Sequence, residues 1–348
     1  MSSKKDYLSY HEIHGQYRSL RQTLDYMQSM SEAVRAFFEP GRDVVFVASG
    51  SSYWMSLSAH LTLRRKTGKR TAAIKAGDIV LCPDEFVPGF SNPILICPSR
   101  SGRTSEVLLA IGHMRAAYPD LKVLSLVEYD QSPLEDVSDL TLRMPWANEA
   151  SVCQTQSFSN LYLAAVLLAG ILADDRSLFD AAAQYLAAAP ALYARHEAMI
   201  ARIVTGDKPK SMVSLGCGLQ YGVCIEGAYI VTEMAEFSTN YYQLLEYRHG
   251  PIVTADAGTF IFILSAPGSE AYEQKIARDA ERAGAVVCVF SGMPADYGKY
   301  GFSIGSDVPK EVVALHYVFC MQSIAFHFSV GRGKNPDQPG SLVPFIEL

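Results

Sequence analysis

Residues 43–53 read DVVFVASGSSY, and this stretch decides the fold class of the chain. The run 44–48 is apolar and rich in β-branched side chains, which is typical of a strand buried on both faces of a parallel sheet. It leads directly into the small residues 49–52, after which residues 55–65 show helical spacing. A strand, a small-residue turn and a helix form half of a βαβ unit, so the stretch predicts an α/β protein.

The rest of the first half continues this alternation of strands and helices. A helix is expected at residues 106–116, and further strands are expected at residues 71–76, 93–97, 123–127 and 140–144. Strands that alternate with helices at this pace predict a doubly wound parallel sheet.

Two helical segments flank the expected sheet in sequence. Residues 9–38 show helical spacing before the first strand, and residues 157–201 are almost wholly helical and rich in Ala and Leu. We interpret the second segment as the connection to the other half of the chain. Pro190 should break or kink it, because proline lacks a backbone N–H and clashes with the preceding turn.

The second half of the chain repeats the first. Aligning Gly218 with Gly50 gives an offset of 168 residues, and two landmarks agree at this offset: Tyr221 with Tyr53, and the expected strand 260–265 with residues 92–97. This agreement indicates an internal duplication. A strand at residues 286–290 and a long apolar helix at 310–329 complete the second half.

Length and composition limit the classes to which the protein can belong. With 348 residues, the chain suggests two domains, and contents of 49% hydrophobic and 19% charged residues indicate a well-packed globular protein. The net charge of −6 argues against nucleic acid or an anionic membrane as the main partner. A small anionic substrate stays possible, because backbone N–H groups and helix dipoles can hold it.

The seven cysteines are scattered, with no CxxC motif and no His/Cys cluster along the sequence. We therefore expect neither a zinc site nor a disulfide framework. Residues 1–13 are polar and lack the apolar core of a signal peptide, and no apolar run looks long enough to span a bilayer. The expectation is a soluble, cytoplasmic protein.

Two turns of the first half carry candidate binding residues, at 49–52 and at 99–104. Each lies where a strand ends and a helix begins, which is where open α/β sheets bind ligands. Their Gly, Ser and Thr residues offer close backbone approach, free N–H groups and hydroxyls, so the pair predicts a phosphate site, although helix capping alone would also explain each turn. Neither a GxGxxG motif nor a P-loop is present, so we expect a phosphorylated small molecule rather than a nucleotide.

Two further stretches could supply catalytic or binding groups. Residues 149–158 place small polar side chains before a long apolar helix, for which capping is the simpler interpretation. In residues 226–251, Glu226 and Glu233 are seven residues apart and share a helix face, and His249 follows in a loop. A buried carboxylate and a histidine can exchange protons near neutral pH, although an amphipathic surface helix would show the same pattern.

Four motifs in order (SGSS, SRSGRT, EASVCQTQSF and EGAYIVTE…EYRHGP) resemble the double sugar-isomerase (SIS) domain family. The match runs from about residue 40 to the end of the chain. It implies two SIS domains in tandem, each an α/β, flavodoxin-like or Rossmann-like three-layer sandwich. The expected division is a helical segment at 1–38, a phosphate-binding domain at 39–190, a catalytic domain at 191–330 and a tail at 331–348, whose apolar end should pack back on the body.

The resemblance also implies roles for the residues at matching positions. The substrate-binding positions are Gly50, Ser51, Ser52, Ser99, Arg100, Ser101 and Thr104, mostly for phosphate, and Val152 and Gln154 for the sugar. Glu233 matches the glutamate that moves a proton between C1 and C2 of the open-chain sugar, His249 matches the ring-opening histidine, and Glu226 matches a supporting acidic position. In the family this histidine reaches the neighbouring subunit's site, which implies a homodimer with shared active sites. No cofactor and no metal are expected.

Two departures separate this chain from the isomerase half of glucosamine-6-phosphate synthase. The synthase has a helix lysine at the position of Ile230 and a second lysine at the position of Pro344, and both look tied to ring opening and Schiff-base chemistry. Only about forty residues precede the first strand, so we also expect no glutamine-hydrolysing domain. The chain is closer to the fructosamine-6-phosphate deglycases, which keep the Glu/His pair without these lysines.

The resemblance therefore favours a phosphosugar deglycase that cleaves a fructosamine 6-phosphate to glucose 6-phosphate and an amine. One alternative is an aldose–ketose isomerase or an amino-sugar-phosphate deaminase of the same fold, and another is a non-catalytic phosphosugar sensor. The amine part of the substrate stays open: Arg100, Arg103 and Arg248 could face a carboxylate on it or lie solvated at the surface.

Overall fold

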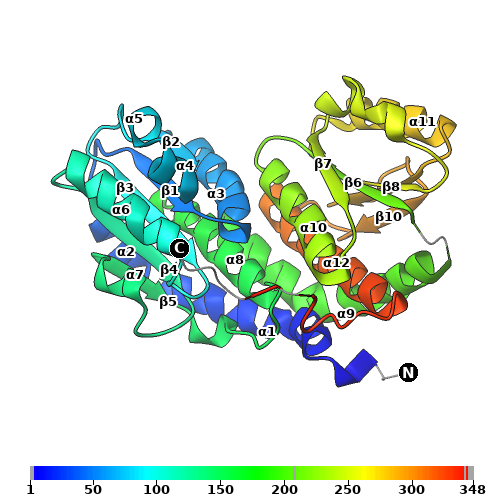
Figure 1. Ribbon diagram of the computed structural model, residues 1–348, viewed down its shortest axis with the longest axis horizontal. Coiled ribbons are helices and arrows are strands. Elements are labelled where there is room, and N and C mark those ends of the chain that lie inside the picture. The colour runs from blue at the N-terminus through cyan, green and yellow to red at the C-terminus, as the bar shows by residue number, and fades with distance from the viewer. Residues whose placement is uncertain (1–3, 207–208, 341, 344–348) are drawn as a thin grey trace. The chain divides into compact units, whose positions relative to one another are not determined.

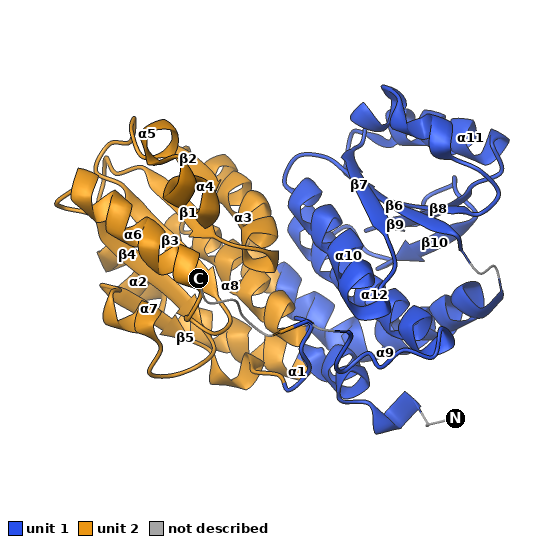
Figure 2. Cartoon of the chain, viewed as in Figure 1, with its two compact units in different colours: residues 1–17, 150–155, 181–342 blue, residues 18–149, 156–180, 343–348 orange. Residues whose placement is uncertain are grey.

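The computed structural model of the chain describes residues 4–206, 209–340 and 342–343. The chain divides into two compact units (Figure 2): unit 1 comprises residues 1–17, 150–155 and 181–342, and unit 2 comprises residues 18–149, 156–180 and 343–348. The domain boundary expected at residue 190 stays a prediction. The apolar end that was expected to pack back on the body falls mostly on residues 344–348, which lie outside the described residues.

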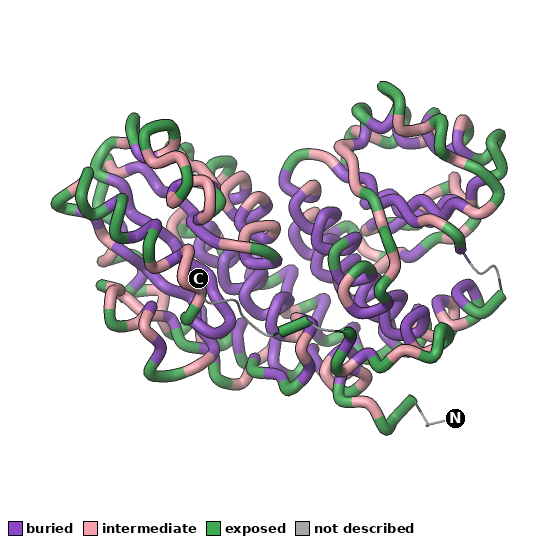
Figure 3. Tube along the Cα trace, in the orientation of Figure 1, coloured by how far each residue is buried: buried purple, intermediate pink, exposed green. Residues whose placement is uncertain are grey.

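The sheet of unit 2 has five parallel strands in the order β2-β1-β3-β4-β5 (Figure 1). The strands are β1 (Val44–Ala48), β2 (Thr71–Lys75), β3 (Ile94–Ser99), β4 (Lys122–Val127) and β5 (Leu140–Arg143). All five were predicted to within two residues. The central strands β1 and β3 are buried at every position, as their unbroken apolar runs require (Figure 3).

Helices cover both faces of this sheet. The helices that belong to unit 2 alone are α2 (Ser31–Phe37), α3 (Ser51–Thr67), α4 (Ala76–Leu81), α5 (Pro83–Phe86), α6 (Ser105–Ala117), α7 (Pro133–Asp136) and α8 (Gln156–Leu172). On one face, side chains of α4 and α6 join alternate residues of β1, β3 and β4 in a single apolar core. Helices α3 and α8 pack against each other and against the strands as a second helical layer, which gives the three-layer sandwich expected from the sequence.

Unit 1 contains a second five-stranded parallel sheet, in the order β10-β9-β8-β6-β7. Its strands are β6 (Ser211–Gly216), β7 (Thr239–Gln243), β8 (Thr259–Leu264), β9 (Val286–Ser291) and β10 (Tyr300–Ser303). Matched strand for strand, this order equals that of unit 2, so the predicted fold class is confirmed. The sequence interpretation missed β7 and β10, because these short edge strands are partly solvated and carry no apolar run.

The helices of unit 1 also form layers around their sheet. They are α10 (Gln220–Ala235), α11 (Glu270–Arg282) and α12 (Lys310–Gly331), with the short turns η3 (Glu246–Arg248) and η4 (Pro251–Thr254) after β7. Helices α10 and α12 approach closely at Gly227, where an added Cβ would lie 2.3 Å from the Tyr317 hydroxyl. That hydroxyl donates a 2.9 Å hydrogen bond to Ser214 of β6, which fixes α12 against the sheet.

The structure corrects two sequence expectations about helices. Helix α9 (Ser177–Gly206) continues through Pro190, and the break falls earlier, between Leu172 and Ser177, where Asp174 adopts a positive φ of 50°. Helix α12 has 22 residues and contains an 18-residue window with a mean hydropathy of 1.4, so it is long and apolar enough to cross a membrane, contrary to the expectation from sequence. Its apolar window is completely buried in the structure, as in the core helix of a globular domain.

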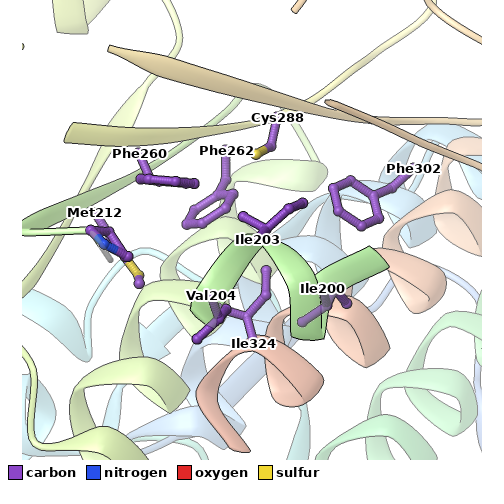
Figure 4. Close-up of a pocket in the computed structure, with 10 residues that line it drawn as sticks. Ile200, Ile203, Val204, Met212, Phe260, Phe262, Cys288, Phe302 and Ile324 are labelled. Atoms are coloured by element: carbon purple, nitrogen blue, oxygen red, sulfur yellow. The ribbon is translucent and has the colours of Figure 1, made fainter. Parts of the chain in front are cut away.

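The apolar core of unit 1 is closely packed between α9, α12 and the sheet. Figure 4 shows Ile203 and Ile324 facing Phe260, Phe262 and other apolar side chains around a small void. This void measures about 10 Å³, which is room for one water-sized probe. It is a packing defect rather than a ligand site.

Candidate active site

The two predicted phosphate turns lie together in unit 2. Strands β1 and β3 are neighbours, with Phe46 opposite Ile96, and they lead into the turns before α3 and α6 (Figure 1). Strand order reverses here, because β2 lies on one side of β1 and β3 lies on the other. Both turns therefore stand at the carboxyl edge of the sheet, at its topological switch point, where such folds bind ligands.

Neither helix is capped by a side chain, so simple capping does not explain the turns. The N-cap residues are Gly50, with φ of 56°, and Thr104, and neither makes a side-chain capping hydrogen bond in the described structure. Ser51 and Ser52 form the first turn of α3 and are buried. The leading N–H groups of α3 and α6 can therefore donate to an anion.

The turn at residues 99–104 is shaped by its own hydroxyls. Ser99 Oγ accepts a 3.0 Å hydrogen bond from the Gly102 N–H, and Ser101 Oγ accepts one of 3.2 Å from the Arg103 N–H. Gly102 has φ of 61°, and an added Cβ would lie 2.4 Å from Ser132 Oγ, so this position requires glycine. Because both serine hydroxyls accept from the turn, their hydrogens remain available to donate.

Behind this turn lies a buried group of charges that the sequence did not predict. Arg100 is 5% exposed, and its Nη1 lies 3.7 Å from Oε1 of Glu149, whose side chain is fully buried. Glu128, also buried, follows β4 and accepts a 2.7 Å hydrogen bond from the Ser157 hydroxyl. Burial, and then the neighbouring Glu149 carboxylate, raises the pKa of Glu128 well above its usual value of 4.5. In the sequence, the one indication of this group was Glu128, an acidic residue directly after a buried strand.

The three arginines considered as ligands for a substrate carboxylate have different environments. Arg100 is buried beside Glu149, whereas Arg103 is exposed. Arg248 is half-exposed and pairs with Asp279 of α11 at 3.0 Å. Only Arg103 matches the simple picture of a solvated surface arginine.

The predicted sugar-contacting segment lies in unit 1 and is held at several points. Glu12 of helix α1 (Leu8–Ser29) accepts a 2.7 Å hydrogen bond from the Ala150 N–H. The Val152 N–H donates to the Asp337 carbonyl at 3.1 Å, so this N–H is already used within the chain. Gln154 Oε1 is buried and has no hydrogen-bond partner among the described residues, which makes its amide the better candidate to meet a ligand.

Helix α10 carries both predicted catalytic carboxylates. Glu226 is 2% exposed and Glu233 is half-buried, so the buried carboxylate is the supporting one and not the proposed proton carrier. Burial, then Glu233 and to a smaller extent Glu226, raises the pKa of Tyr229, which places both carboxylates near this phenol. Ile230, between them in sequence, is 1% exposed and belongs to the core.

His249 ends the short turn η3 and is exposed in the single chain. Its N–H donates to the Glu246 carbonyl at 3.0 Å, and its neighbour Tyr247 is fully buried. Burial raises the pKa of Tyr247 to about 12. The buried tyrosine therefore anchors the loop while the imidazole points away from the core of unit 1.

The structure also reveals a His/Cys cluster that the sequence did not show. Donor atoms of His196, from α9, and of His316 and Cys320, from α12, lie within 4.8 Å of one another, and all three residues are buried. Burial lowers the pKa of His316 and lowers that of His196 to about 4. His196 Nδ1 lies 2.7 Å from His316 Nε2, and the Tyr185 hydroxyl lies 3.2 Å from His316 Nδ1. This donor set could hold a metal ion, yet both ring nitrogens of His316 already have hydrogen-bond partners, as in a structural network.

Comparison with known proteins finds one family-model match and a set of similar proteins. Residues 207–300 match the model of the SIS domain. Glutamine–fructose-6-phosphate aminotransferases (isomerizing) match almost the whole chain, with 23% identity over 97% of it for the protein of Sulfurisphaera tokodaii and 27% over 97% for that of Pyrobaculum aerophilum. The chain spans just over half the length of these curated relatives, at 56% and 57%.

Solved structures share the two-domain fold. A glucosamine-6-phosphate deaminase from Thermotoga maritima has a TM-score of 0.78 at 26% identity, covering 94% of this chain and 99% of its own. A tagatose-6-phosphate ketose/aldose isomerase from Escherichia coli has a TM-score of 0.85 at 20% identity, covering 99% and 98% of the two chains. The C-terminal domain of the glucosamine–fructose-6-phosphate aminotransferase of Francisella tularensis has a TM-score of 0.81 at 18% identity, covering 97% and 100%. The chain therefore contains a match to the SIS domain at residues 207–300, and its two five-stranded parallel sheets share the fold of these solved structures.

Proposed function

We propose that the chain is a sugar-phosphate enzyme that cleaves fructosamine 6-phosphates to glucose 6-phosphate and an amine. One observation carries this proposal: α10 presents Glu226 and Glu233 but buries an isoleucine at position 230, where the synthase pattern has lysine. A site without that amine forms no Schiff base with a sugar carbonyl there. It suits a substrate that already contains its own amine.

The proposed chemistry uses one carboxylate and one imidazole. His249 helps to open the sugar ring, and Glu233 then removes a proton from C1 of the open-chain 1-amino-1-deoxyfructose 6-phosphate to give an enaminol. Reprotonation at C2 leaves an imine at C1. Water adds to this imine and the C1–N bond breaks, which releases the amine and glucose 6-phosphate.

In this proposal the turns of unit 2 hold the phosphate. The uncapped N-termini of α3 and α6 and the hydroxyls of Ser99 and Ser101 provide donors for a dianion. Arg100 is paired with Glu149, so its role is to shape the turn through its backbone and to limit the local negative charge. The structural similarity of the chain to enzymes that act on sugar phosphates supports a phosphosugar as the ligand.

The test is a coupled assay for glucose 6-phosphate across a panel of fructosamine 6-phosphates. We expect turnover with at least one member, and no glucose 6-phosphate above background across the panel would overturn the proposal. Glu233→Gln should abolish turnover while the substrate still binds by calorimetry. The matched control Glu281→Gln, an exposed carboxylate on α11, should leave turnover unchanged.

A second candidate function is supported by the 26% identity to the Thermotoga glucosamine-6-phosphate deaminase. An enzyme of that kind would release ammonia from an amino-sugar phosphate. Assays of ammonia release from glucosamine and galactosamine 6-phosphate, run beside the deglycase panel, distinguish the two. Ammonia release without any deglycation would replace the first proposal with the second.

The exposure of His249 in the single chain supports a homodimer in which each imidazole serves the partner's Glu233. Mixing inactive Glu233→Gln protein with inactive His249→Gln protein should then restore activity, to about a quarter of wild type if subunits exchange at random. No recovery, with subunit exchange confirmed by mass spectrometry, would show that each chain uses its own histidine. The cytoplasmic location stays a prediction.

A further inference from the structure

The carboxyl edge of the second sheet, in unit 1, is hollowed by a cavity that the proposed reaction does not use. The cavity measures about 510 Å³ and lies beside Ser265, which follows β8, and Ser291, which ends β9. A volume of this size suits a small molecule. Its position is the one where open α/β sheets bind ligands, yet none of the proposed phosphate or acid/base residues lines it.

The rim of this cavity is acidic. Glu270 begins α11, Asp296 lies between β9 and β10, and Asp307 precedes α12, so three separate segments each contribute one exposed carboxylate. Among the described residues that line the cavity, none is Lys, Arg or His. A phosphate or carboxylate ligand would be repelled here, whereas an ammonium group would be attracted.

The floor of the cavity carries an unsatisfied polar group. Ser291 is 7% exposed, and its hydroxyl has no hydrogen-bond partner in the described structure. A buried hydroxyl without a partner costs free energy, which a ligand that bonds to it would recover. The walls add apolar surface from Met293, Val308 and Val313, so the cavity offers contact to an aliphatic stem as well as to a charged head.

The same edge of unit 2 has the opposite chemistry. There the turn at 99–104 contains two arginines and three hydroxyl-bearing residues, whereas the corresponding turn in unit 1 reads Ala266-Pro267-Gly268-Ser269 and leads into Glu270. We propose that the cavity of unit 1 is a second ligand site, which takes a small organic cation with a primary ammonium group and an aliphatic stem. This inference is independent of the proposed reaction.

The probe for this site is cadaverine, titrated into the full chain by calorimetry, with pentane-1,5-diol as its neutral counterpart and glutarate as its anionic one. We expect cadaverine to bind with a Kd on the order of 1 mM or tighter. The diol should bind more weakly, and glutarate should not bind. Because the carboxylates are exposed, added salt should weaken the binding of cadaverine.

Substitutions around the cavity test whether cadaverine binds there. Glu270→Gln and Asp307→Asn should each weaken cadaverine about threefold, as expected for exposed ion pairs. Ser291→Val should weaken it by removing the buried hydroxyl, and Glu281→Gln on the outer part of α11 should leave it unchanged. Circular dichroism confirms that each variant is folded.

Two results would overturn the proposal. One is the absence of cadaverine binding up to about 20 mM, a concentration well above the expected Kd. The other is binding that the diol matches or that Glu281→Gln weakens as much as the rim variants do, because this would show general attraction to an acidic surface. Loss of deglycase activity would leave the inference intact, since its readout is binding alone.

Discussion

The two buried glutamates behind the phosphate turn of unit 2 have different electrostatic environments, and a matched pair of substitutions distinguishes them. Glu149 lies 3.7 Å from the permanently charged Arg100 guanidinium. Glu128 has a pKa raised well above 4.5 by burial and by Glu149, and it accepts a hydrogen bond from Ser157. The group therefore contains one ion pair and one carboxyl group whose protonated form is favoured by its surroundings.

The two substitutions should have very different costs. Glu149→Gln removes the carboxylate that is paired with the buried Arg100 guanidinium, which costs about 3–5 kcal/mol of unfolding free energy. Glu128→Gln introduces an amide of the same shape whose oxygen can still accept from Ser157, so near pH 5 its cost should be within about 1 kcal/mol. At higher pH the variant should gain stability relative to the wild type, because it lacks the carboxyl group whose pKa is raised.

The pH dependence supplies a second, independent readout. Because the pKa of Glu128 is higher in the folded state, the folded chain holds a proton that the unfolded chain has lost at pH values between 4.5 and the folded pKa. Across that window this group makes stability fall as pH rises, by about 1.4 kcal/mol per pH unit. Glu128→Gln should remove that part of the slope.

The assay is urea unfolding followed by tryptophan fluorescence, between about pH 5 and pH 8. The chain has two tryptophans, Trp54 and Trp146, and both belong to unit 2, so the signal reports this unit. Glu32→Gln, an exposed carboxylate on α2, is the control and should change neither stability nor slope. Equal losses for the Glu128 and Glu149 variants at pH 7, or an unchanged slope in Glu128→Gln, would refute the assignment of charges.

Three further substitutions have expected outcomes. Asp337→Ala removes acceptors for the N–H and hydroxyl of Ser9, at 2.8 and 2.6 Å, and should lower stability by about 1–2 kcal/mol, measured by thermal unfolding. Gly102→Ala places a Cβ 2.4 Å from Ser132 Oγ at a positive φ, so it should weaken binding of inorganic phosphate, measured by calorimetry; unchanged affinity would remove this turn from the site. Ile230→Lys buries an ammonium in the core and should lower Tm instead of creating synthase chemistry; an unchanged Tm would show that this position is accessible.

Much of the fold could be predicted because its central strands are unambiguous in sequence. Strands such as β1 and β3 are buried on both faces, so continuous apolar runs mark them. The edge strands β7 and β10 are half-solvated, and their sequences TNYYQ and YGFS contain no such run. They form because a neighbouring strand offers backbone hydrogen bonds, which a local pattern does not reveal.

The parts of the candidate site that depend on local backbone structure could be predicted from the sequence. The parts that depend on residues far apart in the chain could not. The turns at 49–52 and 99–104 follow from strand ends and small residues. The burial of Arg100 could not be predicted, because its partner Glu149 is 49 positions away and reaches it only in the folded unit. The Val152 N–H is used by Asp337 for the same kind of reason, since that contact joins residues far apart in the chain.

The two sheets show why an internal duplication predicts fold better than chemistry. Strand order rests mainly on the buried central strands of each sheet, and both units retain it. The charge at the carboxyl edge depends on a few loop residues, such as Arg100 and Arg103 in unit 2 and Glu270 and Asp307 in unit 1, which add little to the core. The charge of these loops can therefore change from positive to negative without cost to the fold. A ligand inferred for the edge of one sheet cannot be transferred to the edge of the other, so the charge of each loop must be considered separately.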